Sequence, residues 1–422
     1  MSLPRLVVHE HRLDNGLKIL LVPSRDAPLV AVSLWYRTGS RHDPPGEAGT
    51  AHMLEHMLYK GTRRHPQGAY DHILHEQGAV HNASTWYERT NYYILISSDR
   101  YETALELEAD RMRGALLDAA GLGDEIEVVV NELQRSEDDP ATALHERLLA
   151  RAFPGHPYGR PVGGTPGEVR GLTAERLRDF YDAHYRPNHA YLVVAGDYDE
   201  GRILERVASA FGPIPAGPAR LSEPPGAPPQ SAERRFELRR AGGREQLLLG
   251  YRAPARRHPD VPALDLLAQV MGQGRMSRLH RALVEPGMAV QAGAENPAAL
   301  VHPFLFYIDV SPSLGAPRES IDAVLEREID RLSREPVTDA ELGRARKQAR
   351  VDLVLRCDRV SARGALVGEL EATVGWRYLD DYLSRLAAVE AEDVRRVAAT
   401  YLVPRGRTVG HFRPDGEGEK SA

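Results

Sequence analysis

The sequence contains only one cysteine, Cys357, among its 422 residues. A single thiol excludes an internal disulfide and any metal site built from several cysteines. No partner histidine is suggested near Cys357, so we expect an unreactive, partly buried side chain at this position. The chemistry of the chain must therefore come from other residue types.

The sequence also lacks a long apolar run and a strong charge of either sign. No stretch of eighteen or more apolar residues is present, so a membrane span is not expected. The net charge of −6 argues against a nucleic-acid-binding protein, which would usually present a basic face. Near the N-terminus charges interrupt the apolar residues, unlike the continuous apolar stretch of a signal peptide. The cytoplasm is the expected location.

Proline and glycine are concentrated in one segment near the middle of the chain. Residues 213–233 are rich in proline, glycine and alanine and show neither a helical nor a strand period, as is typical of a linker. The length of the chain favours two or three domains, and 42% hydrophobic residues fit a globular protein. We expect an N-terminal domain at 1–212 and a C-terminal domain at 234–422.

Both parts begin with the same order of elements. A strand-like run at 29–36 precedes a polar loop and an amphipathic helix at 49–59, and strand-like residues 246–251 precede a helix that starts near residue 261. Strands and helices mixed without strict alternation predict an α+β fold. We expect two similar halves, each a mostly antiparallel sheet covered by helices, related by internal duplication. Further helices are expected at 101–117, 124–136 and 318–335.

The segment 49–59, GTAHMLEHMLY, predicts a metal site. Helical positions four apart lie one turn above each other, so His52 and His56 project to the same side, where two imidazoles can bind one ion. Glu55 lies beside that face and can act as a catalytic base. This H-x-x-E-H order is the reverse of the commoner H-E-x-x-H pattern.

A catalytic zinc ion needs a third protein ligand, and spacing alone leaves its identity open. The acidic helix after residue 124 offers Glu132, with Glu125 two turns earlier on the same face, while Glu127 and Glu137 compete. A carboxylate at the position of Glu125 could orient a ligand histidine. Four nearby histidines suggest no shared face with the pair and are not expected to bind the metal: His65, His72, His75 and His81.

These residues resemble the pitrilysin-type inverzincin peptidases, a family that includes insulin-degrading enzyme and the mitochondrial processing peptidase. The resemblance covers nearly the whole chain, through LDNGL at 13–17, GSR at 39–41, GTAH at 49–52 and YKGT at 59–62. It implies one Zn2+ per chain and makes Glu132 the third ligand, because VVVNE at 128–132 matches the family's ligand helix. The family's supporting glutamate falls on Glu125. The length of the chain most resembles the short bacterial and mitochondrial members.

The resemblance also implies where a peptide binds. The segment GAVHNAST at 78–85, followed by TNYY at 90–93, matches an edge strand that pairs with peptide substrates in the family. Pairing through the main chain gives affinity without demanding a particular sequence. Asn82 and Ala83 match the positions that contact the substrate backbone, although Asn82 alone would read as a turn residue.

One departure from the family pattern bears on partners. In members of the family, the second half of the chain carries an arginine and a tyrosine that steady the substrate. In this sequence the tyrosine position holds Val290, and the arginine position holds Leu283 or Val284. Neither type of side chain can donate a hydrogen bond to an oxyanion. Arg281 or Arg278 is the alternative source of the missing arginine.

The sequence as a whole predicts a zinc metalloendopeptidase that hydrolyses peptides or unfolded segments. The expected assembly is a heterodimer with a zinc-free homologous subunit that supplies the arginine and tyrosine. Two alternatives stay open, namely a self-sufficient homodimer and a non-catalytic peptide-binding or structural subunit on the same fold.

Overall fold

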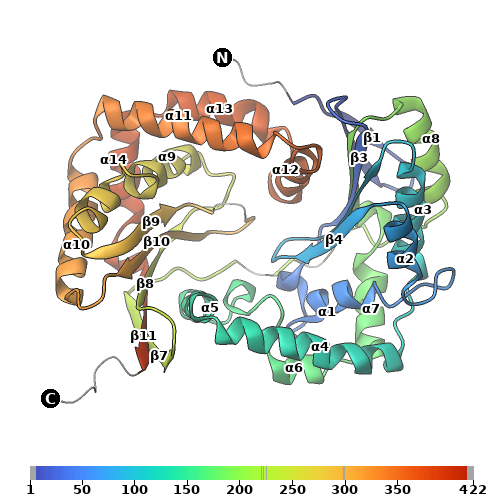
Figure 1. Cartoon of the computed structure of the whole chain (residues 1–422), viewed down its shortest axis with the longest axis horizontal. Coiled ribbons are helices and arrows are strands. Elements are labelled where there is room, and N and C mark those ends of the chain that lie inside the picture. Colours follow the sequence, from blue (N-terminus) through green and yellow to red (C-terminus); the bar gives the residue numbers. More distant parts are fainter. Residues whose placement is uncertain (1–5, 220, 222, 225, 298–299, 416–422) are drawn as a thin grey trace. The chain divides into compact units, whose positions relative to one another are not determined.

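The computed structural model describes residues 6–219, 221, 223–224, 226–297 and 300–415. The chain forms two compact units (Figure 1). Unit 1 comprises Met1–Gln134, Pro161–Pro224 and Val354–Trp376. Unit 2 comprises Arg135–Arg160, Pro225–Leu353 and Arg377–Ala422. Each unit is discontinuous in sequence, whereas the expected domains were continuous.

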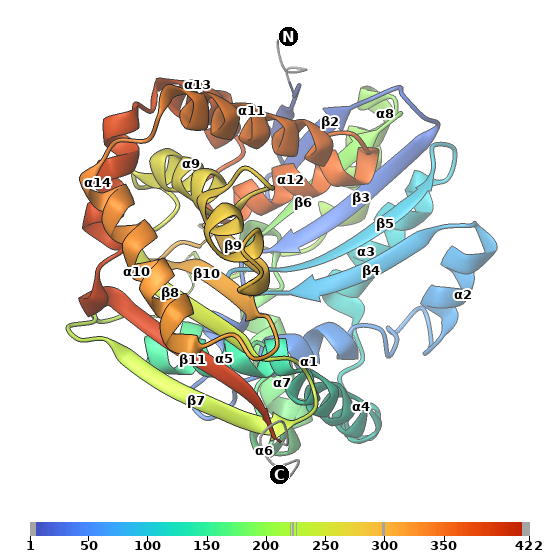
Figure 2. The same ribbon diagram turned by 60° about the vertical axis from the view of Figure 1, so that its left-hand side comes forward.

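A six-stranded sheet forms the centre of unit 1, in the order β1-β2-β6-β3-β5-β4. Its strands are β1 (His9–Arg12), β2 (Lys18–Pro23), β3 (Leu29–Tyr36), β4 (Val80–Thr85), β5 (Thr90–Ser97) and β6 (Ala190–Gly196). Only the β2–β6 pair is parallel. The outer strand β4 pairs with β5 alone, so one of its edges is unpaired within this sheet (Figure 2).

Both faces of this sheet are apolar because successive strand residues point to opposite sides. Along β2, Ile19 and Leu21 join a large core, whereas Leu20 and Val22 join a smaller one. The large core is formed with helices of the first half, and the smaller core includes Val360 and Val367 from the second half. The helices of unit 1 are α1 (Thr50–Met57), α2 (Ala69–Glu76), α3 (Tyr101–Gly114), most of α4 (Ala119–Asp138), α6 (Pro166–Arg170), α7 (Ala174–His184), α8 (Glu200–Phe211) and α12 (Val360–Thr373).

The helix α12 packs closely on the sheet of unit 1. A Cβ atom built at Gly368 would lie 2.2 Å from Trp35 of β3, so only glycine permits this approach. The hydroxyl of Tyr191 on β6 donates a hydrogen bond of 2.8 Å to the Gly368 carbonyl. The second half of the sequence thus covers one face of the sheet that the first half builds.

A five-stranded sheet forms the centre of unit 2, in the order β7-β11-β8-β10-β9. Its strands are β7 (Arg234–Ala241), β8 (Gln246–Ala253), β9 (Ala289–Glu295), β10 (Phe304–Pro312) and β11 (Arg407–Asp415). The helices of unit 2 are α5 (Pro140–Ala152), α9 (Val261–Gly272), α10 (Arg318–Arg334), most of α11 (Asp339–Arg356), α13 (Tyr378–Ala388) and α14 (Ala391–Tyr401). Gly250 and Gly410 leave room on one face for Leu148 and Leu144 of α5.

The two sheets confirm the predicted duplication. In each half, the first two strands of the shared pattern are followed by a helix, then by an antiparallel pair, and later by a strand that inserts between the first two. The inserted strand, β6 or β11, is parallel to one neighbour and antiparallel to the other. The fold is α+β, with two sheets that each carry helices, as expected.

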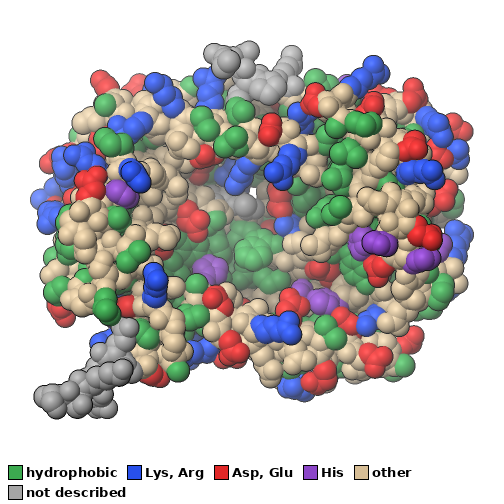
Figure 3. Space-filling model, in the orientation of Figure 1, with side chains coloured by type: hydrophobic (Ala, Val, Ile, Leu, Met, Phe, Trp, Pro, Cys, Tyr) green, Lys and Arg blue, Asp and Glu red, His purple; other side chains and the backbone are tan. Residues whose placement is uncertain are grey.

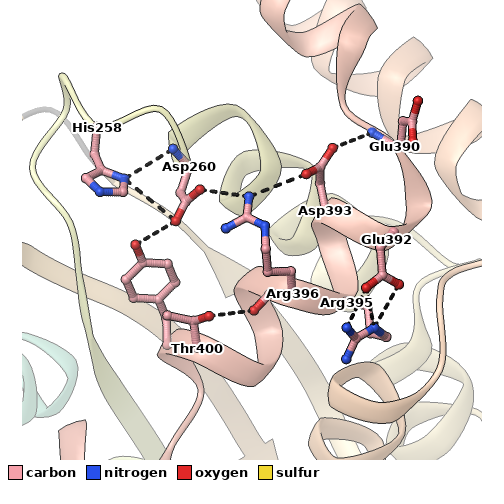
Figure 4. A network of polar contacts seen from close by, with 9 residues as sticks. His258, Asp260, Glu390, Glu392, Asp393, Arg395, Arg396 and Thr400 are labelled. Atoms are coloured by element: carbon pink, nitrogen blue, oxygen red, sulfur yellow. Dashed lines mark hydrogen bonds and ion pairs between the residues drawn. The ribbon is translucent and has the colours of Figure 1, made fainter.

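A polar network fixes the N-terminus of α9 to α14 within unit 2 (Figure 4). Asp260, which precedes α9, accepts a hydrogen bond of 2.8 Å from the hydroxyl of Tyr401 and forms an ion pair of 2.8 Å with Arg396. The backbone N–H of Asp260 donates to His258 Nδ1. These residues therefore serve packing between helices.

Between α8 and β7 the described residues form no helix or strand. Short helical turns occur at η1 (Ser40–His42), η2 (Pro157–Gly159), η3 (Pro187–His189), η4 (His280–Val284) and η5 (Pro404–Gly406). In the described part of the chain, no helix combines the length and the hydropathy needed to cross a membrane.

Candidate metal centre

Local sequence determines how α1 begins and which way it faces. Gly49 has φ = 96°, a left-handed conformation that favours glycine. Asp43 accepts hydrogen bonds from the backbone N–H groups of Gly49 and Ala51, at 2.8 and 2.9 Å, and so satisfies donors at the free helix end. Met53 and Leu54 are fully buried in the core. The opposite face, with the histidines, is therefore turned toward a cavity.

The structure brings His52, His56 and Glu132 together. Oxygen atoms of Glu132 lie 3.8 Å from His52 Nε2 and 3.4 Å from His56 Nε2, and one ligand atom from each residue falls within 4.8 Å of the others. Ligands about 2.1 Å from a tetrahedral ion would lie about 3.4 Å apart, so two imidazoles and this carboxylate fit zinc. Figure 3 shows histidine and acidic side chains gathered on the surface over α1 and α4.

Glu125 supports this cluster from the neighbouring turns of α4. Its Oε1 lies 2.9 Å from His56 Nδ1, and its other oxygen forms an ion pair with Lys60. The hydrogen bond with His56, together with Lys60, outweighs burial and lowers the pKa of Glu125 to about 2. Burial lowers the pKa of His56, but the hydrogen bonds with Glu125 and Glu132 dominate and raise it to about 9 in the metal-free protein. Glu125 therefore fixes the ring of His56 with Nε2 directed toward Glu132.

Burial is the main influence on the pKa values of Glu55 and His52. Burial lowers the pKa of His52 to about 4, so its imidazole is neutral and able to bind a metal at neutral pH. Burial also raises the pKa of Glu55, although a hydrogen bond of 2.5 Å from the Thr85 hydroxyl to Oε2 acts in the opposite direction. A carboxyl group with a raised pKa can both accept and return a proton near neutral pH.

A cavity of about 520 Å3 adjoins the cluster. His52, Glu55 and His56 line one side of it, and Asn82 and Ala83 of the edge strand β4 line another. Further lining residues come from the turn after α1, from α2 and the segment before it, and from α4, namely Tyr59, Lys60, Gln67, Gly68, Asp71, Glu125 and Glu132. The predicted site residues thus surround one cavity in unit 1.

Two segments of the chain match families of known proteins. Residues 18–166 match "Insulinase (Peptidase family M16)" and residues 171–349 match "Peptidase M16 inactive domain". The chain belongs to peptidase family M16. One M16 relative, the "Zinc protease PqqE" of Helicobacter pylori, is 28% identical over 409 residues, which cover 95% of this chain and 92% of that protein. The "Probable mitochondrial-processing peptidase subunit beta" of Arabidopsis thaliana is 26% identical, over 95% of this chain and 77% of that protein.

Solved M16 structures share the fold. The crystal structure of a protease from Helicobacter pylori has a TM-score of 0.91 and 27% sequence identity, and the match covers 97% of this chain and all of that one. Pitrilysin has a TM-score of 0.80 at 21% identity, and the match covers 99% of this chain but 46% of pitrilysin. The likeness to pitrilysin concerns the fold alone.

The residues at the predicted departure from the M16 pattern lie in unit 2. Leu283 is fully buried, and Val290 on β9 is 57% exposed. Arg278 forms two hydrogen bonds with Glu341, at 2.8 and 3.1 Å, so its guanidinium is already engaged within unit 2. Arg281, in the turn η4, is exposed. Of the two alternative arginines, Arg281 is the one with an accessible side chain.

Three residues near the candidate metal cluster were not identified from the sequence. Lys60 lies within the matched YKGT segment, and Thr85 ends the matched edge strand. Neither match indicates that Lys60 contacts Glu125 or that Thr85 contacts Glu55. Asp71 carried no signal at all. Across the described residues, no metal-binding group includes His65, His72, His75 or His81.

Proposed function

We propose that this chain is a zinc metallopeptidase in which His52, His56 and Glu132 hold one Zn2+ and Glu55 is the catalytic base. The observation that carries the proposal is the convergence of these three ligand atoms within 4.8 Å, beside a cavity that Glu55 also lines. The relatives named zinc proteases support it. Glu125 acts as the positioning residue for His56.

When bound, zinc supplies Lewis acidity and lowers the pKa of water at the position that three ligands leave open. Glu55 accepts the proton of the attacking water and returns it to the amine that leaves. Thr85 holds the carboxylate of Glu55 in place through its hydroxyl. Glu125 and Lys60 keep His56 oriented while the charge around it changes.

Peptides or unfolded segments are the proposed substrates. The strand β4 has an unpaired edge within its sheet, and Asn82 and Ala83 on this strand line the cavity. An extended peptide can add to such an edge through main-chain hydrogen bonds. Folded proteins rarely offer an extended strand, so they should be poor substrates.

Three substitutions test the proposal. Glu55→Gln should retain zinc and lose peptide cleavage by at least about a thousandfold, because the base is lost while the ligands remain. Glu132→Gln should weaken zinc binding, whereas Glu127→Gln on the same helix should not, since Glu127 pairs with the exposed Arg170. Bound zinc and cleavage of unfolded casein are the measurements. Full cleavage by Glu55→Gln would contradict the proposal.

We further propose that full activity needs a second, zinc-free homologous chain. The nonpolar side chains of Leu283 and Val290 cannot donate hydrogen bonds to a developing oxyanion, which supports the idea. The zinc-loaded chain purified alone should then cleave peptides poorly. Full activity of a homodimer that is lost in Arg281→Ala would favour the self-sufficient alternative.

A non-catalytic binding role is the remaining alternative. Zinc retained without cleavage by the wild-type chain, even with the homologous subunit added, would favour it. The cytoplasm stays a prediction from the pattern of the N-terminal residues.

A further inference from the structure

The cavity beside the metal centre extends to a carboxylate that has no part in the proposed chemistry. Asp71 lies in the first turn of α2, and its side chain lines the same cavity as Glu55 and His52. That side chain is 54% exposed. The helix α2 supplies no residue to the metal cluster, so Asp71 is free to serve another purpose.

The charges nearer the metal centre are already matched. Glu125 is shared between His56 and Lys60, and Glu132 lies against both ligand histidines. With a divalent ion bound, the two charges of the ion and that of Lys60 equal those of Glu55, Glu125 and Glu132. Asp71 is the carboxylate left without a balancing charge among the residues that line the cavity.

His81 is close to Asp71 but does not cancel its charge. His81 Nε2 lies 3.4 Å from Asp71 Oδ1, and its ring stacks on Tyr59 with the ring centroids 6.0 Å apart. Burial lowers the pKa of His81, and Arg111 adds to this effect, while Asp71 and Glu108 oppose it. The imidazole is therefore neutral at neutral pH and offers Asp71 a hydrogen bond at most.

The ring of Tyr59 adds a second element of recognition. Tyr59 lines the cavity, so a long side chain that reaches Asp71 can lie along an aromatic wall. Arginine and lysine combine an apolar stem with a terminal cation, which suits an aromatic wall that ends at a carboxylate. A glutamate side chain would meet repulsion there, and leucine would gain nothing from Asp71.

We propose that Asp71 makes this cavity select peptides that carry arginine or lysine next to the cleaved bond. The inference rests on the proposed peptidase function, because it concerns the same cavity. It assigns Asp71 to specificity and leaves the bond-breaking chemistry with Glu55 and the metal ligands.

The test compares peptides that differ at a single residue. The cleaved bonds are first located by mass spectrometry of a casein digest, and one cleaved sequence is then synthesised with arginine, leucine or glutamate on either side of its bond. The zinc-loaded protein should show a kcat/KM for the arginine peptide about fivefold above that for the leucine peptide, as a half-exposed ion pair would give. This ratio should shrink as ionic strength rises.

Two variants at Asp71 and one matched control complete the test. In Asp71→Asn the ratio of arginine to leucine should fall to about one, and Asp71→Arg should prefer glutamate over arginine. Glu76→Gln removes a charge from the far end of the same helix, outside the cavity lining, and should keep the wild-type ratio. A wild-type ratio of one, or a ratio that survives Asp71→Asn, would overturn the inference.

Binding separates this inference from the proposed function. In a zinc-loaded Glu55→Gln background, fluorescence anisotropy with labelled peptides should show the same fivefold preference for arginine, lost when Asp71→Asn is added. If the wild-type chain cleaves no peptide even with a zinc-free homologous chain added, the proposed function fails, but the binding ratio still decides selectivity. Equal binding of the arginine and leucine peptides would refute selectivity whatever the cleavage result.

Discussion

The helices α1 and α9 follow the second strand of the pattern that the two halves share, yet they carry very different residues. In α1, Met53, Leu54 and Met57 fill the core, while two histidines and a glutamate face the cavity. In α9, nine of twelve residues are buried, and the sequence VPALDLLAQVMG contains neither histidine nor glutamate. One helix of the pair combines packing with metal-binding residue types, and the other serves packing alone.

This difference teaches that the scaffold does not depend on the metal-binding residues. Both helices are held by apolar side chains, which contribute roughly 1.5–3 kcal/mol for each large side chain buried. The polar residues of α1 lie on the face that packing leaves free. A duplicated half can therefore lose or gain a metal site without losing its fold.

Replacing a proposed metal ligand of unit 1 should have the largest effect on function. His56→Ala should lose bound zinc and reduce peptide cleavage by at least about a thousandfold, because the ion loses one of three protein ligands. His258→Ala, which alters a histidine of unit 2 that bonds Asp260, should change neither quantity. Atomic absorption and a cleavage assay check both variants. Zinc retained at full stoichiometry by His56→Ala would contradict the proposed difference in metal binding between the two units.

One ion pair in each half, fully buried in unit 1 and partly buried in unit 2, allows a comparison of stability. Arg111 is 1% exposed, forms an ion pair with Glu108 and lies over the rings of Tyr59, Tyr70 and Tyr92. Arg111→Met should destabilise the protein by about 3–5 kcal/mol, because the fully buried Glu108 would keep only the hydrogen bond from Tyr70.

The matched change in unit 2 should lower the free energy of unfolding by less. Arg278→Met leaves Glu341 with hydrogen bonds from the backbone and hydroxyl of Thr338, and with partial exposure to water. Denaturant unfolding of both variants measures the difference. Equal losses would show that the two pairs are equivalent despite their different burial.

Replacing the supporting carboxylate should have a moderate effect. Glu125→Gln should weaken zinc binding by about 10–100-fold, because it weakens the hold on His56 and unpairs Lys60. Competition with a chelator gives the zinc affinity. A change below twofold would mean that α4 positions His56 without the charge of Glu125.

The smallest expected effect concerns acid stability in unit 2. Burial alone would raise the pKa of Glu341, but the hydrogen bonds from Arg278 and Thr338 lower it to about 2, against 4.5 for the ordinary group. A carboxylate with a depressed folded pKa stabilises the protein above pH 4.5, and this contribution is lost as the pH falls toward 2. Glu341→Gln should therefore lose less stability than the wild type between pH 4.5 and 2, as measured by urea unfolding at several pH values. Parallel losses would contradict this assignment.

The local features of the fold follow from the sequence. Strand β3 spans the predicted residues, and α10 ends within one residue of its predicted bound, because alternating or helically spaced apolar residues mark such elements. The start of α4 was predicted five residues too late. Gly121 and Gly123 weaken the helical signal there, but Asp118 accepts a hydrogen bond from the Gly121 N–H and permits the earlier start.

In the candidate site too, local features follow from the sequence, whereas contacts between distant elements do not. The four-residue spacing of His52 and His56 predicts that they share a face, and the structure brings Glu132 to them. The contacts of Thr85 with Glu55 and of Lys60 with Glu125 join elements far apart in sequence, so no local pattern reveals them. The position of Asp71 on the cavity wall likewise depends on how α2 packs.

The exchange of α5 and α12 between the halves has a consequence for how the chain is made. As the protein leaves the ribosome, the sheet of the first half is complete at the end of β6, but the helix that covers Trp35 and Val193 begins about 160 residues later. That apolar face remains exposed to water until α12 emerges from the ribosome. A gene cut at the linker should therefore give an N-terminal fragment that aggregates on its own and gains solubility when the C-terminal fragment is produced beside it.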